Sequence, residues 1–141
     1  MNKKEILEII LDHFEFVERE LPSIRSIVKE KDPYALARKM FALNWKDHGE
    51  KVHLISEKLT KFGSEFQRLS LDIYHHIRGP LVTFGVIVED IRLKRDFIDA
   101  IKYVDQGRVS EEGWKLMDYS LIHLAHDLEE LKKRVQMLLS Q

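Results

Sequence analysis

The sequence contains no cysteine, only three prolines and six glycines, and no long uninterrupted apolar run. The absence of cysteine excludes disulfide bonds, thiolate nucleophiles and zinc or iron–sulfur sites held by cysteine, and it fits a reducing compartment. Near the start of the chain, Glu5, Glu8 and Asp12 interrupt the apolar residues, so this stretch lacks the core of a signal peptide or membrane span. We therefore expect a cytoplasmic protein without a membrane segment.

An excess of charge of either sign is also missing. The 23 lysine and arginine residues and the 24 aspartate and glutamate residues give a formal net charge of −1, and the two signs are mixed along the chain. Such a surface does not favour nucleic-acid phosphates or an anionic membrane, so we expect neither as a partner. With 44% apolar and 33% charged residues in 141 positions, the composition indicates one soluble domain with a narrow core.

Every stretch of the sequence with a clear apolar period has the period of an α-helix, which predicts an all-α fold. Predicted N-terminal helices cover about 3–20, stopping at Pro22, then a short helical piece, then about 33–49, capped by Asp32, and 50–62. Gly63 then ends one helix, and Ser64 with Gln67 has the spacing of a capping box for the next. This junction divides the chain into an N-terminal helical segment, 1–62, and a C-terminal segment, 63–141.

The C-terminal segment has a heptad-like apolar pattern, which predicts two long helices joined near Gly107, with Ser110 as the N-cap of the second. The predicted seam of the first helix contains Phe66, Ile73, Ile77, Pro80, Phe84, Ile87, Ile91, Ile98 and Ile101. The predicted seam of the second contains Trp114, Met117, Leu121, Leu124, Leu128, Leu131, Val135 and Leu138. Because a lone hairpin leaves apolar surface in water, we expect a homodimer that forms a four-helix bundle. Alternatively, the N-terminal helices cover the seam within one chain.

One short stretch, His75 to Leu81 with the sequence HHIRGPL, stands out within the first helix of this hairpin. With Ile73 and Ile77 on the seam, helical geometry places His75 on the outer side. His76 lies nearer the edge of the seam, and Arg78 is again on the outer side. Pro80 removes the hydrogen bond to the carbonyl of residue 76 and predicts a kink that costs about 3 kcal/mol, with Gly79 adding local freedom. The simplest interpretation is a surface histidine pair beside a packing defect.

The same residues resemble the H-box of sensor histidine kinases, His-x-(Leu or Ile)-Arg-x-Pro-Leu. The family's dimerisation and histidine phosphotransfer domain is a helical hairpin that dimerises into a four-helix bundle, and the resemblance covers roughly 64–141. It implies that His75 accepts a phosphoryl group and exchanges it with an aspartate of a response-regulator receiver domain. It also implies that Arg78 steadies the phosphate, and that a receiver domain, a sensor kinase or both are the partners.

The sequence departs from the family at two positions of the motif. His76 stands where the family usually has an acidic residue that assists the kinase step, and Gly79 stands where many members have a threonine or asparagine that supports dephosphorylation. No ATP-binding domain or glycine-rich phosphate loop is found, so we expect no ATP-dependent kinase activity from this chain. A phosphotransfer intermediate in a relay, or a fragment of a longer kinase, remains compatible with the sequence.

Two other functions are compatible with the sequence. The first is a non-catalytic helical dimer that binds and modulates a kinase or regulator. The second is a metal-binding bundle, because His53 with Glu57 and His123 with Asp127 each place two ligand types one helical turn apart. Such short spacings are common by chance, so we expect no metal and no cofactor. His13 and His48 are expected at the surface or at a helix interface.

Overall fold

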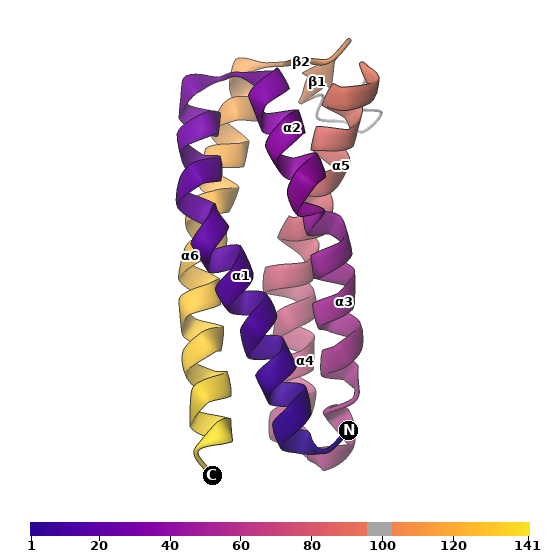
Figure 1. Ribbon diagram of the computed structural model, residues 1–141, viewed down its shortest axis with the longest axis vertical. Coiled ribbons are helices and arrows are strands. Elements are labelled where there is room, and N and C mark those ends of the chain that lie inside the picture. The colour runs from indigo at the N-terminus through magenta and orange to yellow at the C-terminus, as the bar shows by residue number, and fades with distance from the viewer. Residues whose placement is uncertain (96–102) are drawn as a thin grey trace.

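The computed structural model describes residues 1–95 and 103–141 and confirms an all-α fold (Figure 1). The helices are α1 (Lys3–Glu30), α2 (Pro33–Leu43), α3 (Trp45–Glu57), η1 (Thr60–Phe62), α4 (Ser64–Ile73), η2 (Tyr74–Arg78), α5 (Gly79–Leu93) and α6 (Glu111–Leu139). A short ribbon of β1 (Val104–Asp105) and β2 (Arg108–Val109) precedes α6. The predicted seam residues Ile98 and Ile101 lie outside the described residues.

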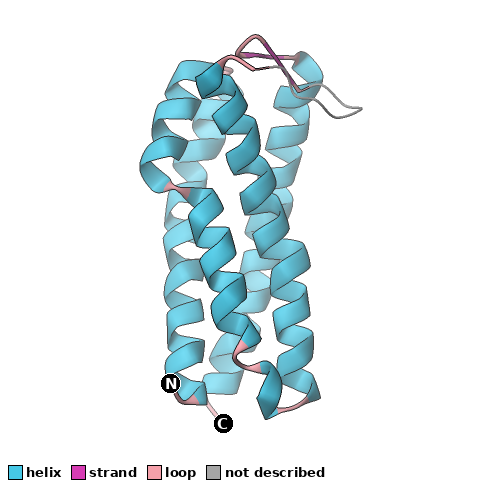
Figure 2. Ribbon diagram, turned by 90° about the vertical axis from the view of Figure 1, so that its right-hand side faces the viewer, coloured by secondary structure: helices cyan, strands magenta, loops and turns pink. Residues whose placement is uncertain are grey.

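The helices form an up-and-down bundle within one chain (Figures 1 and 2). The α1 helix runs up and packs against α6 and α3; α2 and α3 run down along α5; and α4, η2 and α5 form one rod between η1 and the ribbon. Both predicted segments contribute to a single hydrophobic core. The alternative in which the N-terminal helices cover the hairpin is therefore realised, and the bundle itself requires no second copy.

The first helix continues through Pro22, so the predicted stop at this residue is wrong. Ile24 and Val28, two and six residues after Pro22, are only 0% and 2% exposed. Burial of these side chains against the core offsets the cost of the missing backbone hydrogen bond at Pro22. The helix begins with a capping box of Asn2 and Glu5 that the sequence analysis did not identify.

The predicted helix over 33–49 is divided at Asn44, whose backbone is left-handed with φ of 51°. Asp32 caps its start as predicted, because its side chain accepts hydrogen bonds from two backbone N–H groups, each at 3.1 Å. Gly49 does not end a helix but lies inside α3, where an added Cβ would be 3.0 Å from Leu81 Cβ. Close packing of α3 on α5 explains this glycine better than a helix terminus.

The junction at Gly63 is confirmed as a helix boundary, with φ of 134°, but the predicted capping box is absent. No side chain caps α4, and Gln67 instead donates a hydrogen bond to the Thr60 carbonyl at 3.2 Å. The α4 helix then passes into the π turn η2, and buried positions step from Ile73 to Ile77 to Leu81.

The predicted seam position at Pro80 is therefore wrong, since Leu81 is fully buried and Pro80 is only partly buried. A π turn contains more residues than an α turn, and it moves the next buried position one residue along the chain.

The last helix follows its predicted pattern, because all eight of its predicted seam residues are buried. Ser110 is its N-cap and accepts a hydrogen bond from the Gly113 N–H at 3.0 Å. The connection before it is a two-stranded ribbon, which the sequence analysis did not predict. Gln106 and Gly107 both have positive φ, 51° and 81°, as a tight hairpin turn requires. Within the described residues, no helix is both long and apolar enough to cross a membrane.

Candidate functional site

His75 lies on η2, in the middle of the rod formed by α4, η2 and α5, with its side chain exposed. Its ring contacts Tyr74 edge-on, with the centroids 5.1 Å apart. Among the described residues, no hydrogen bond or ion pair holds the imidazole. The outward orientation predicted from the seam agrees with this position, and both ring nitrogens remain available to a partner.

A groove of about 270 Å³ runs beside His75 between α5 and α6. Its floor is mostly apolar and includes Phe84, Ile87 and Met117, while Thr83 and Ser120 add hydroxyl groups. His75 lines one part of this groove. A partner that reaches the imidazole can therefore bury apolar side chains at the same time.

Arg78 is positioned by Glu50 of α3 and by the aromatic ring of Tyr74. Its Nη2 atom lies 3.3 and 3.4 Å from the two carboxylate oxygens of Glu50, and its guanidinium lies 5.0 Å from the centre of the Tyr74 ring. The His53 ring in turn contacts Tyr74, with centroids 4.9 Å apart. Glu50 and His53 belong to α3, so the surroundings of the motif include residues that the hairpin alone does not contain.

His76 has different neighbours from His75. Its Nδ1 atom lies 3.5 Å from Asp127 Oδ2 on α6, and its side chain is 53% exposed. His126 approaches the other oxygen of Asp127 at 3.7 Å. The predicted place of His76 near the edge of the seam fits this contact. The carboxylate that α6 supplies beside the motif, Asp127, is not predicted from the sequence as a neighbour of His76.

Gly79 and Pro80 form the transition from η2 to α5. The Gly79 N–H donates to the Tyr74 carbonyl, five residues back, which is the hydrogen bond of a π turn. The predicted interruption at Pro80 thus takes the form of a wider turn in a continuous rod. Pro80 has no N–H to donate to the His76 carbonyl, so a standard α-helical ladder cannot pass this point unbroken.

A second histidine pair lies away from the motif, on α1 and α3. His13 Nδ1 and His48 Nδ1 are 2.9 Å apart, and Phe16 stacks on the His48 ring with centroids 4.3 Å apart. Burial lowers the pKa of both imidazoles below their ordinary value. Both residues are predicted at a surface or a helix interface, but no local pattern pairs them, because they are 35 positions apart.

The two histidine–carboxylate spacings considered for a metal do not build a larger ligand group. His53 Nδ1 lies 3.6 Å from Glu57, and His123 packs on Tyr119 with ring centroids 4.3 Å apart. Across residues 1–95 and 103–141, no group of three or more histidine or acidic side chains is arranged to hold a metal ion. These two spacings therefore lend no support to a bundle metal centre.

Comparison with protein-family models, curated proteins and solved structures finds no match to this chain. Function must therefore be inferred from the residues and their geometry.

Proposed function

We propose that this protein is a histidine phosphotransfer protein of two-component signalling, with His75 as the phospho-acceptor. The observation that carries the proposal is the exposed imidazole of His75, which no hydrogen bond or ion pair holds within the described residues. This imidazole leads a motif that resembles the H-box. A histidine buried for structural reasons would have at least one polar partner.

The chemistry requires the neutral imidazole as the nucleophile. One ring nitrogen attacks the phosphorus of an aspartyl phosphate while the other keeps its proton. The P–N bond forms as the P–O bond to the aspartate breaks, and the aspartate leaves as a carboxylate. The reverse transfer to a second aspartate regenerates His75, so no nucleotide is consumed by this chain.

Arg78 and the neighbouring groove support such a transfer. Arg78 is one helical turn from His75, and its contacts with Glu50 and Tyr74 limit its motion. A positioned guanidinium can stabilise the charge of a transferring phosphoryl group. The apolar groove between α5 and α6 offers a docking surface for a receiver domain, and docking supplies the alignment that the reaction needs.

The bundle completed within one chain favours a relay intermediate that acts as a single copy. The His75 surface is formed by η2 and α5 and flanked by α6, and none of these elements needs a second molecule to complete the bundle. A phosphorylated receiver domain or sensor kinase supplies the phosphoryl group, and a second receiver domain takes it.

The test is transfer of radiolabelled phosphate from phosphorylated receiver domains and kinases of the same organism. We expect acid-labile label on the wild-type chain, complete loss of label in His75→Gln, and retention in His76→Gln. Arg78→Gln should be labelled more slowly, by about tenfold or more. Unchanged melting temperatures would show that each variant is folded.

Two results would contradict the proposal. Label that persists in His75→Gln would show that a residue other than His75 accepts the phosphoryl group. No label from any donor, with the wild-type chain folded, would leave a binding role as the better explanation.

A non-catalytic binding protein is the second candidate, and exposed aromatic residues of α2 favour it. Tyr34 and Phe41 are 65% and 68% exposed, and a groove of about 250 Å³ lies between α2 and α5 beside them. Large exposed aromatic side chains of this kind are typical of protein interfaces. A protein of this second type would tolerate His75→Gln and lose its partner on Phe41→Ser.

A further inference from the structure

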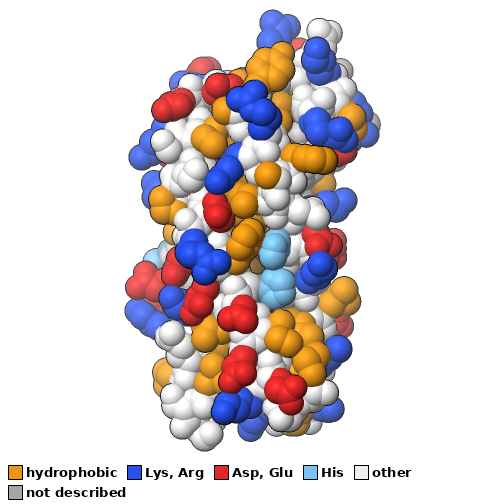
Figure 3. Space-filling view, in the orientation of Figure 1, with side chains coloured by type: hydrophobic (Ala, Val, Ile, Leu, Met, Phe, Trp, Pro, Cys, Tyr) orange, Lys and Arg blue, Asp and Glu red, His pale blue; other side chains and the backbone are white. Residues whose placement is uncertain are grey.

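His13 and His48 present two imidazole nitrogens to each other where α1 contacts α3. Their Nδ1 atoms are 2.9 Å apart and their rings are inclined by 72°. Both side chains are only partly buried, and histidine side chains reach the molecular surface on the face that shows α1 and α3 (Figure 3). An ion in solution can therefore reach the pair.

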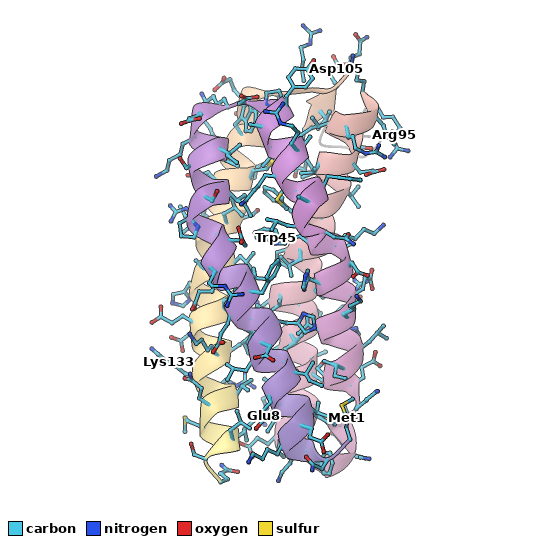
Figure 4. All side chains as sticks on the ribbon, viewed as in Figure 1. Met1, Glu8, Trp45, Arg95, Asp105 and Lys133 are labelled. Atoms are coloured by element: carbon cyan, nitrogen blue, oxygen red, sulfur yellow. The ribbon has the colours of Figure 1, made fainter. Side chains whose placement is uncertain are left out.

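The pair is held in place by its surroundings. Phe16 stacks on His48 with an interplanar angle of 19°, which fixes the plane of that ring. His13 lies within the 28-residue helix α1 and His48 lies in the first turn of α3, and neighbouring residues of both helices are buried in the core. Figure 4 shows Trp45, at the start of α3, pointing into the centre of the bundle. Rigid elements of this kind keep ligand atoms at a fixed separation.

The separation fits two neighbouring positions around a transition metal. Imidazole nitrogen binds such ions at about 2.0–2.1 Å, and two nitrogens 2.9 Å apart then subtend about 90° at the ion. An angle of about 90° is that of adjacent ligands in square or octahedral coordination, whereas tetrahedral coordination requires the nitrogens to move apart. Copper(II) and nickel(II) prefer the square or tetragonal arrangement with nitrogen and oxygen ligands.

The charge state of the pair also suits a cation. Burial is the largest cause of the lowered pKa of each histidine, and for His13 the neighbouring His48 adds to it, so both rings are neutral near pH 7. Asp12 and Asp47, which directly precede the two histidines, place negative charge nearby, while Lys51 opposes it from α3.

We propose that His13 and His48 form a binding site for a divalent transition-metal ion such as copper(II) or nickel(II), with water completing the coordination shell. The proposed site has two protein ligands, and within the described residues no group of three histidine or acidic side chains adds to them. In the metal-free protein one Nδ1 carries the proton of the hydrogen bond between the rings. That proton moves to Nε2 of the same ring when the ion binds, so no net proton is released.

The test uses copper(II) added to the full chain, with affinity measured by competition and the ligands identified by electron paramagnetic resonance. We expect one ion per chain with two coordinated nitrogens. His48→Phe keeps the aromatic contact with Phe16 but removes a ligand, and it should weaken binding by about tenfold or more. His13→Phe should do the same, and copper(II) should raise the melting temperature of the wild type but not that of His13→Phe or His48→Phe.

The matched control is His123→Phe, because His123 and His126 lie three residues apart on α6 and offer another pair of imidazoles. This variant should bind copper(II) as the wild type does. Unchanged affinity in both His13→Phe and His48→Phe, or loss only in His123→Phe, would overturn the proposal. If either phenylalanine variant fails to fold, His48→Gln, which has a smaller and polar side chain, is tested in its place. We expect the same loss of a coordinated nitrogen in the electron paramagnetic resonance spectrum.

Discussion

Two histidine pairs in this molecule contrast in sequence and in space. His75 and His76 are neighbours in the chain, yet one lines a groove between α5 and α6 while the other faces Asp127. His13 and His48 are separated by 35 positions and meet at 2.9 Å. Neighbouring residues on a helix point in directions about 100° apart, whereas packed helices bring distant residues together.

The contrast also separates two kinds of chemistry. His75, exposed and without a polar partner among the described residues, is suited to reaction with an incoming group. The His13–His48 pair is partly buried and fixed by a hydrogen bond between the rings, which suits it to binding or to sensing protons. The residue type is the same, so the difference lies in the surroundings.

The largest effect on stability is expected from a substitution that disrupts the hydrophobic core of the bundle, whose helices hold both histidine pairs. Ile24→Asp would place a carboxylate at a position that is 0% exposed, and we expect a loss of about 3–5 kcal/mol in the free energy of unfolding. Ile122→Asp is the matched control, because Ile122 is 45% exposed and its change should stay within about 0.5 kcal/mol. Urea denaturation measures both. Similar losses in the two variants would contradict the burial of α1 beyond Pro22.

A smaller effect is expected from pH, and it should separate the two pairs. The pKa of His13 and of His48 is lowered by burial from the ordinary 6.5, so the unfolded chain binds protons at higher pH than the folded chain. The stability of the wild type should therefore be full above pH 6.5 and fall as pH drops through 6.5 towards the lowered values.

The double variant with His13→Phe and His48→Phe should lose this part of the pH dependence of stability when denaturation is measured between about pH 7 and 5. The His75→Gln variant should keep it. An equal reduction in both variants would show that the dependence arises elsewhere in the chain.

The smallest effects are expected from substitutions of two glycines of α5. Gly79 lies beside His75 and His76 in the chain, and Gly85 lies where α5 packs against Lys46 of α3. A Cβ at Gly85 would lie 2.8 Å from Lys46 Cβ, so Gly85→Ala should destabilise the protein by about 1–3 kcal/mol. A Cβ at Gly79 would lie 3.6 Å from the Tyr74 carbonyl oxygen, an ordinary contact. Gly79→Ala should therefore stabilise it by about 0.5–1 kcal/mol, as alanine does in a helix interior.

Thermal denaturation compares the two glycine variants directly. A loss of stability in Gly79→Ala, as large as that in Gly85→Ala, would mean that the turn at His75 is as tightly packed as the contact between α3 and α5. The proposed accessibility of His75 would then need revision.

Much of the fold could be predicted from local patterns. The seam of α6 was predicted residue by residue, because steps of three and four residues between large apolar side chains specify one face of a helix. The caps at Asp32 and Ser110 were predicted because a short polar side chain there accepts backbone N–H groups.

Other features were missed for definite reasons. The sequence predicts a helix end at Pro22 because the local cost of proline is visible in it, whereas the burial of Ile24 that offsets this cost is not. The break at Asn44 was missed because a left-handed residue other than glycine leaves a weak signal. The sequence predicts a helix end near Gly49 because the close packing of this glycine against Leu81 depends on another helix.

For the candidate site, the sequence by itself determined the outward position of His75, because the seam residues on either side of it fix which way the helix faces. It also determined that Pro80 must interrupt a regular hydrogen-bond ladder. Only the tertiary structure decided that the N-terminal helices complete the bundle and that Glu50 holds Arg78. It alone decided that His13 meets His48. These contacts join residues far apart in the chain, and their energies arise only when whole helices pack, so no local pattern can encode them.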